Sequence, residues 1–130
     1  MKCKVTARAK VSPTEELDKV IKAISNVLDY DELEIGDGYV DVTGDEDSLL
    51  KFREALKNRK IRDTAQKIFF KGVDDHKIKF SLSKQTALVA IPNFVEPGMS
   101  ALGEIDIEIE TDDVDGFIEW MTYKKSEESV

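Results

Sequence analysis

Side chains that could carry out catalysis or bind a metal ion are scarce in this chain. His76 is the single histidine and Cys3 the single cysteine among 130 residues. A Ser-His-Asp triad would have to use His76, while a structural zinc site and a disulfide framework are both excluded. Because His76 follows Asp74-Asp75 and begins an apolar strand face, we expect it to be structural or simply exposed. The sequence therefore predicts neither a metal site nor a cofactor.

A row of carboxylates is the second place where chemistry could reside. Glu104, Asp106, Glu108 and Glu110 alternate along one predicted strand and project from the same face. Glu104, Asp106 and Glu108 could serve acid–base catalysis or hold a hard cation such as Ca²⁺ or Mg²⁺. We favour the alternative of a solvated strand face. A phosphate-binding loop is not indicated either, because residues 36–38 lie between two strand patterns with no helix after them. We therefore expect a protein that is not an enzyme.

The distribution of charge is more informative than its total. The formal net charge is −8, yet residues 51–71 carry eight basic and only two acidic side chains. Residues 29–47 carry nine acidic and no basic side chains, and residues 96–130 carry eleven acidic and two basic ones. A basic helical segment can contact nucleic-acid phosphates, although nucleic-acid binders are usually basic overall. The alternative is that the basic segment pairs with the chain's own acidic strands or with a second subunit.

Five cations of this basic segment are our main candidates for phosphate contacts, and a polar pair further along the chain supplies two lesser ones. Lys60, Thr64, Lys67 and Lys71 are predicted to share one helical face. Residues 84 and 85 separate two apolar segments, where a connecting turn could carry a site. The alternative there is that the glutamine binds the turn's backbone and the lysine is solvated. The full candidate set is Arg59, Lys60, Arg62, Lys67, Lys71, Lys84 and Gln85.

The pattern of apolar residues predicts the elements that position these side chains. Alternation predicts strands over residues 2–11, 76–82 and 104–110 and a hairpin over 33–43. Residues 87–91 are continuously apolar, and their length and the following Pro92 favour another strand. A capping box formed by Ser12 and Glu15 opens a helix that runs to about residue 28. Further helices are expected over 45–58, 61–72 and 112–121.

The predicted order β-α-β-β-α-α-β-β-β-α is typical of an α+β protein. We expect an antiparallel or mixed sheet with helices packed on one face, in a single domain over residues 1–123, followed by a polar tail over 124–130. If the basic first strand and the acidic last strand are neighbours, their opposite charges pair across the sheet. An open sheet face could also be half of a homodimer.

The compartment follows from what the sequence lacks. No apolar run approaches the roughly 18 residues that a transmembrane helix needs. Residues 1–5 have no apolar core of a secretory signal. We therefore expect a cytoplasmic protein that does not contact membranes.

Four segments of the sequence resemble the archaeal uncharacterised protein family 0201, and together they extend along nearly the whole chain. Members of this family typically show an R-x-I-x-D-A helix, a strand ending in an N-K-Q-A-A turn, an S-P-L-G-P-I loop into an acidic strand, and a closing I-D-W-L. The similar segments here are residues 59–65, 78–89, 99–105 and 117–120, with Lys84-Gln85 and Leu102-Gly103 in the matching contexts.

The resemblance implies a fold similar to the large-subunit ribosomal protein that binds 5S rRNA, a homodimer, and no assigned activity. Together with the basic segment 51–71, it favours a non-enzymatic binding module for structured RNA or a ribonucleoprotein. The alternative function is a homodimeric protein-interaction module whose segregated charges serve subunit pairing.

Overall fold

The computed structural model describes residues 2–96, 98 and 103–122, and these residues have the expected mixed α+β architecture. The described strands are β1 (Cys3–Lys10), β2 (Glu32–Gly36), β3 (Tyr39–Gly44), β4 (Val73–Asp74), β5 (Lys77–Ser83), β6 (Phe94–Val95) and β7 (Glu104–Thr111). The described helices are α1 (Leu17–Val27), the 3-10 helix η1 (Glu46–Leu49), α2 (Leu50–Asn58), α3 (Arg62–Lys71), α4 (Lys84–Ala87) and α5 (Val114–Thr122). The predicted tail over 124–130 lies outside the described residues.

The strands form one sheet in the order β2-β3-β1-β7-β5-β4, with β6 also paired to β5, and every pairing is antiparallel. The first and last long strands are neighbours, although the ion pairs of their charged faces run to other strands, from Arg8 to Asp41 and from Glu108 to Lys77 and Lys79. In the β1–β7 register, Lys4 lies opposite Glu110 and Arg8 lies opposite Asp106. Strands that are far apart in sequence are therefore joined at the centre of the sheet, where basic and acidic outer faces meet.

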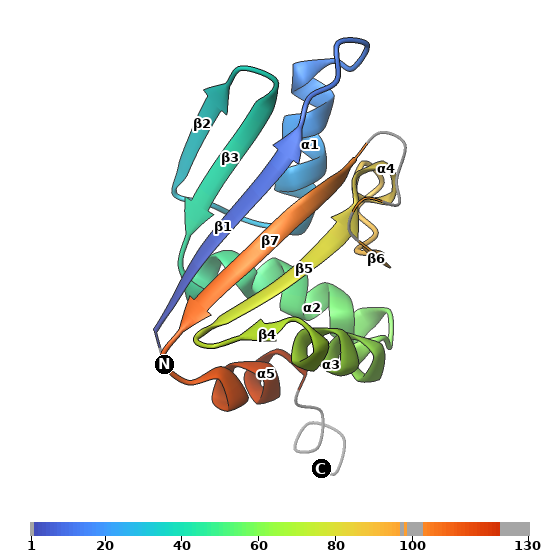
Figure 1. Ribbon diagram of the computed structural model, residues 1–130. Coiled ribbons are helices and arrows are strands. Elements are labelled where there is room, and N and C mark those ends of the chain that lie inside the picture. Colours follow the sequence, from blue (N-terminus) through green and yellow to red (C-terminus); the bar gives the residue numbers. More distant parts are fainter. Residues whose placement is uncertain (1, 97, 99–102, 123–130) are drawn as a thin grey trace.

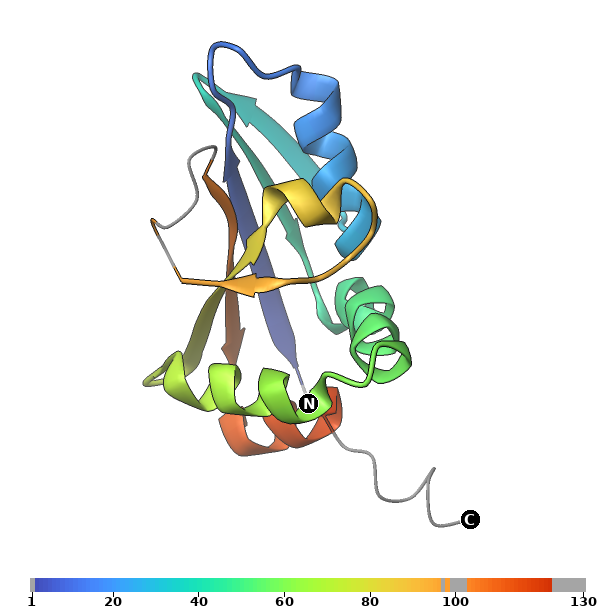
Figure 2. The ribbon, with the colours of Figure 1, turned by 90° about the vertical axis from the view of Figure 1, so that its right-hand side faces the viewer.

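The helices cover one face of the sheet, as the sequence predicts. In Figure 1, α1 and α4 lie in the upper half and α2, α3 and α5 group together in the lower half. Figure 2 shows the sheet from its edge, with α1 and α2 on one side of it. The alternating residues Cys3, Val5, Ala7 and Ala9 of β1 are buried under this layer, whereas Lys4 and Arg8 on the other face are exposed. None of the described helices is long and apolar enough to cross a membrane.

An aromatic cluster joins the lower helices to the sheet. The ring centroids of Phe69 in α3 and Phe80 in β5 are 5.0 Å apart, and those of Phe52 in α2 and Phe80 are 5.7 Å apart. Phe94 of β6 and Phe117 of α5 contact the same cluster through Phe69. Such rings bury large apolar areas, so they fix how α2 and α3 lie on the sheet.

The predicted strand over residues 87–91 is wrong. Ser83 accepts a hydrogen bond from the backbone N–H of Thr86 and begins the one-turn helix α4 instead. Asn26 of α1 donates to the carbonyl oxygens of Ala87 (2.9 Å) and Leu88 (3.1 Å), so the end of this turn is satisfied by a side chain from a distant segment. Ala87 is buried and Leu88 packs against the core, whereas Val89 is 68% exposed.

Two predicted element starts also differ from the structure. Helix α1 begins at Leu17 rather than near Pro13, because residues 12–16 form a turn. Only the reciprocal half of the predicted capping box is present, in which the Ser12 backbone N–H donates to Glu15 Oε1 at 2.9 Å. Strand β5 begins one residue after His76, whose side chain is exposed at the β4–β5 turn.

Candidate nucleic-acid interface

The basic segment 51–71 folds into the α2–α3 pair and the turn between them. Arg59 and Lys60 occupy that turn, and Lys60 has a left-handed backbone with φ 58°. Because α3 begins only at Arg62, the predicted helical stripe loses Lys60 and consists of Thr64, Lys67 and Lys71. The predicted cations thus remain on consecutive elements, although Lys60 extends from a turn rather than from a helix face.

Most exposed cations of the α2–α3 pair and its turn have no acidic partner. Among the described residues, Lys57, Arg59, Lys60 and Lys67 are exposed and form no ion pair. Lys71 lies 3.5 Å from Glu96, and both side chains are largely exposed, so solvent weakens this pair. Arg62 is half-buried and has a partner of its own. We call Lys57, Arg59, Lys60, Lys67 and Lys71 the basic surface.

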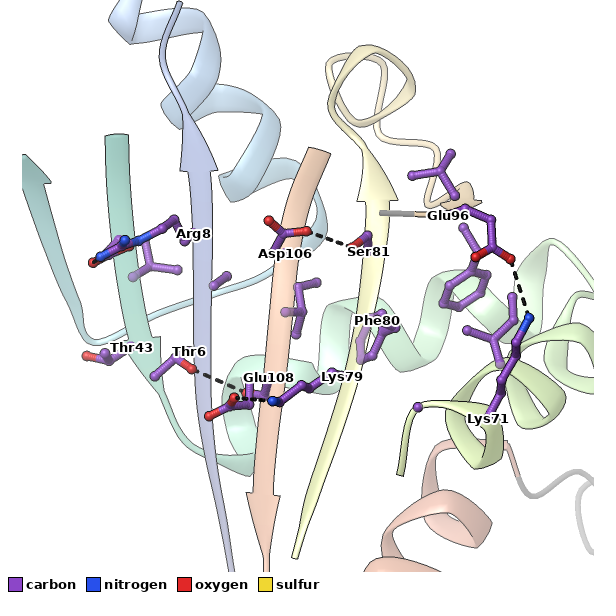
Figure 3. A pocket seen from close by; sticks show the side chains of 18 residues that line it. Thr6, Arg8, Thr43, Lys71, Lys79, Phe80, Ser81, Glu96, Asp106 and Glu108 are labelled. Carbon is purple, nitrogen blue, oxygen red and sulfur yellow. Dashed lines mark hydrogen bonds and ion pairs between the residues drawn. The ribbon is translucent and has the colours of Figure 1, made fainter. Parts of the chain in front are cut away.

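A groove of about 840 Å³ lies on the opposite, helix-free face of the sheet and reaches the end of α3. Figure 3 shows its polar side chains on β1, β7 and β5, with Lys71 and Glu96 at one end. Ser81 Oγ donates to Asp106 Oδ1 at 2.7 Å, and Thr6 Oγ1 donates to the Glu108 carbonyl oxygen at 3.5 Å. Phe80, Phe94 and Ile68 form an apolar part of the lining.

The cations lining this groove, Arg8, Lys71 and Lys79, are outnumbered by its acids, Asp41, Glu96, Asp106 and Glu108. Arg8 donates two hydrogen bonds to Asp41, of 2.7 and 2.8 Å, and these bonds raise the pKa of Arg8. Lys79 lies 3.9 Å from both Glu108 and Asp74. The groove therefore offers little net attraction to a phosphate, in contrast to the basic surface.

The carboxylates of β7 do not form a joint site. Glu104 is buried and accepts a hydrogen bond from the Gly98 backbone N–H at 2.8 Å. Asp106 accepts from Ser81, and Glu108 pairs with Lys77 and Lys79. In the part of the chain that the structure describes, no three His, Cys, Asp or Glu side chains are arranged to hold a metal ion. The alternative of a solvated strand face fits the exposed Asp106 and Glu110 but not Glu104, which is buried.

Lys84 is buried, so both sequence-based expectations of an accessible or solvated lysine at this position are wrong. Its side chain is 4% exposed, and Nζ donates to the Lys10 carbonyl oxygen at 2.6 Å and to Glu15 Oε1 at 2.9 Å. Burial by itself raises the pKa of Glu15, but hydrogen bonds from Ser12 and Lys84 outweigh it and leave that pKa lowered. Gln85 is exposed on α4, away from this contact.

The structure adds two exposed residues to the region of the predicted phosphate contacts. Lys57 belongs to the same basic run and lies on the last turn of α2. Phe70 is 50% exposed on α3 between Lys67 and Lys71. The sequence alone does not separate Phe70 from the buried Phe69, because both are apolar and successive helix positions such as Phe117 and Ile118 can both be buried.

Comparison with known proteins adds independent information. A family model described as RNA binding matches residues 4–111. A UPF0201 protein of Methanothermobacter thermautotrophicus is 42% identical over 118 residues, covering 91% of this chain and 89% of that protein. Two solved UPF0201 structures are similar: one matches with TM-score 0.83 and 32% identity, covering 93% and 94% of the two chains. The other, from Methanococcus jannaschii, has TM-score 0.76, 31% identity, and coverage of 92% and 98%.

Proposed function

The chain belongs to the archaeal UPF0201 family, and on that premise we propose that it is a non-enzymatic module that binds structured RNA or a ribonucleoprotein. The observation that supports this most is the basic surface, whose exposed cations have few acidic partners within the described residues. The match of residues 4–111 to a family model described as RNA binding agrees with it.

The lysine and arginine side chains of the basic surface are placed to bind RNA phosphates. Lysine and arginine neutralise phosphates and release counterions, which gives affinity without sequence preference. Arg59 and Lys60 extend from the turn, while Lys67 and Lys71 extend from α3 one helical turn apart. Arg62 begins α3 between the two pairs. Gln85 on α4 is a lesser candidate, and the burial of Lys84 removes its ammonium group from the set that a phosphate can reach.

The net charge of −8 does not prevent such contacts. The cations of the sheet face are neutralised locally, and acidic residues concentrate in the β2–β3 hairpin and along β7. At physiological ionic strength, exposed charges act over about 8 Å. A phosphate at α3 therefore interacts mainly with the lysines and arginines beside it.

The first test is binding of the protein to 5S rRNA and to an unrelated structured RNA at two salt concentrations. 5S rRNA is the natural probe, because the family resemblance implies a fold similar to the ribosomal protein that binds it. We expect affinity that falls steeply as salt rises. Absence of binding to both RNAs at low salt would refute the proposed function.

Charge reversal tests the assigned surface directly. We expect Lys60→Glu combined with Lys67→Glu to weaken binding of all RNAs to a similar degree. The salt dependence should also flatten, by about one unit of slope for each lysine that no longer binds a phosphate. The matched control is Lys19→Glu with Lys22→Glu, two exposed lysines of α1. Unchanged affinity in the Lys60/Lys67 variant, measured by fluorescence anisotropy, would contradict the assignment.

A second candidate function, a homodimeric protein-interaction module, is favoured by the helix-free sheet face. That face carries a groove of about 840 Å³ that nothing in the described chain fills. Light scattering at low and high salt distinguishes subunit pairing by charge from pairing by buried apolar surface. A dimer that dissociates at high salt is held by charge, whereas a dimer that resists salt is held by apolar burial.

A further inference from the structure

One phenylalanine of this protein lies outside the core. The chain has six phenylalanines, and Phe52, Phe69, Phe80, Phe94 and Phe117 contact one another through their rings. Phe70 is 50% exposed and makes no ring contact with the described residues. Half of a large apolar ring is therefore left in water on α3.

The exposed residues of α3 next to Phe70 are polar or basic, and the exposed Val73 (38%) follows at the start of β4. Gln66 and Lys67 lie one helical turn before it, and Lys71 follows it directly; all three are exposed. Long side chains of a helix lean toward its N-terminus, so the Phe70 ring lies over the turn that carries Gln66 and Lys67. The core of a protein–protein interface is depleted in charged residues, which argues against a protein partner at this position.

We propose that Phe70 is a stacking site for an unpaired RNA base, with Lys67 and Lys71 binding the phosphates on either side of that nucleotide. This inference rests on the proposed RNA-binding function and names its ligand as single-stranded RNA, or an unpaired loop of a folded RNA. An exposed aromatic ring beside cations is what such a ligand requires, because its bases present free π-faces while its backbone carries negative charge.

Paired RNA would not use this site. In an A-form duplex the bases are stacked on one another, and proteins reach mainly phosphates and 2′-hydroxyls. A duplex could contact Lys67 and Lys71 but would leave the Phe70 ring without a base. The Phe70 ring therefore contributes to binding of an unpaired nucleotide and contributes nothing to binding of a duplex.

The test compares a 12-nucleotide uridine oligomer with a 12-base-pair RNA duplex. We expect Phe70→Ala to weaken binding of the uridine oligomer by about 5- to 140-fold, the range for removal of one base–aromatic stack. Binding of the duplex should not change. Phe70→Trp should preserve the affinity for the oligomer, because it keeps an aromatic face. Leu50→Ala, which removes a side chain of similar exposure (49%) from α2, is the matched control and should have no effect.

The outcomes separate this inference from the proposed function. If Phe70→Ala leaves oligomer binding unchanged while the Lys60/Lys67 reversal weakens it, the stacking site is refuted and RNA binding stands. If the unaltered protein binds 5S rRNA but not the uridine oligomer, the stacking site is refuted and the proposed function stands; if it binds none of these RNAs, both proposals fail. If Phe70→Ala weakens binding of the oligomer and of the duplex equally, or only dissociates a dimer, Phe70 does not stack on a base. Equal melting temperatures of Phe70→Ala and Leu50→Ala show that folding is not the cause.

Discussion

Lys84 shows how one residue can serve the fold while resembling a site residue in the sequence. Its ammonium group binds the Lys10 carbonyl oxygen at the end of β1 and the Glu15 carboxylate before α1. Glu15 in turn accepts the backbone N–H of Ser12. Lys84 thereby ties the β1–α1 connection to the beginning of α4. A buried charge requires such partners, because leaving it unpaired in the interior is costly.

Removing one partner of this buried pair should be strongly destabilising. We expect Lys84→Met to lower the free energy of unfolding by about 3–5 kcal/mol, because it leaves the Glu15 carboxylate without its counterion. Combining it with Glu15→Leu should recover part of that stability, since no buried charge then remains. Urea unfolding of the single and double variants measures both effects. A double variant whose destabilisation equals the sum of the two single effects would contradict an interaction between the two side chains.

The lowered pKa of Glu15 predicts a pH dependence of stability. Ionised Glu15 stabilises the folded protein above the ordinary glutamate pKa of about 4.3. That contribution is lost as the pH falls below this value and through the lower pKa of the folded state. Unaltered protein should therefore melt at a higher temperature than Glu15→Gln at pH 7, and the gap should narrow toward pH 3. A gap that is constant over this range would rule out the ionised pair as its source.

At the scale of elements, the aromatic cluster holds the basic helix α3 in place. Phe69 is fully buried and contacts Phe52, Phe80, Phe94 and Phe117. We expect Phe69→Ala to cost about 3–5 kcal/mol of unfolding free energy and Phe69→Leu to cost less, because leucine fills more of the site. Denaturant unfolding measures this difference. A cost of Phe69→Ala no larger than that of an exposed substitution would show that α3 is held by other contacts.

The sequence predicts the elements whose apolar spacing is regular. Alternation predicts β1, β5, β7 and the β2–β3 hairpin, and helical spacing predicts α1, α2, α3 and α5. Periodicity fails at residues 87–91, where a side chain of α1 caps α4 and where Ala90 has a left-handed φ of 61°. It also misses β4 and β6, whose two residues each are too short to show a period.

The candidate site, too, is predictable from the sequence only in part. A run of basic residues is visible in the sequence, so the basic surface could be found from it. The burial of Lys84 depends on Lys10 and Glu15, which are distant in sequence, and no local pattern reveals such partners. The exposure of Phe70 likewise depends on how α3 packs on the sheet, because Phe69 and Phe70 are equally apolar in the sequence.

Across the whole molecule, charge is separated along the sheet. The acidic β2–β3 hairpin forms one edge of the sheet, while α3 packs against β5 near the other edge. Four strand spacings separate β2 from β5, on which α3 packs, and this corresponds to about 19 Å. That distance exceeds the Debye length of about 8 Å at physiological ionic strength but not the length of about 30 Å at 0.01 M salt. The acidic hairpin can therefore oppose RNA binding only at low salt.

This separation predicts different salt behaviour for acids near to and far from the basic surface. Glu32→Gln with Glu34→Gln on β2 should raise RNA affinity roughly threefold at about 0.01 M salt and leave it unchanged at about 0.15 M. Glu54→Gln, an exposed residue of α2 within the basic segment, should raise affinity at both concentrations. Fluorescence anisotropy with one labelled RNA measures the RNA affinity of the unaltered protein and of the two variants. If the affinity of the β2 variant rose equally at both salts, RNA would have to lie against the hairpin, and the assignment of phosphates to α3 would be wrong.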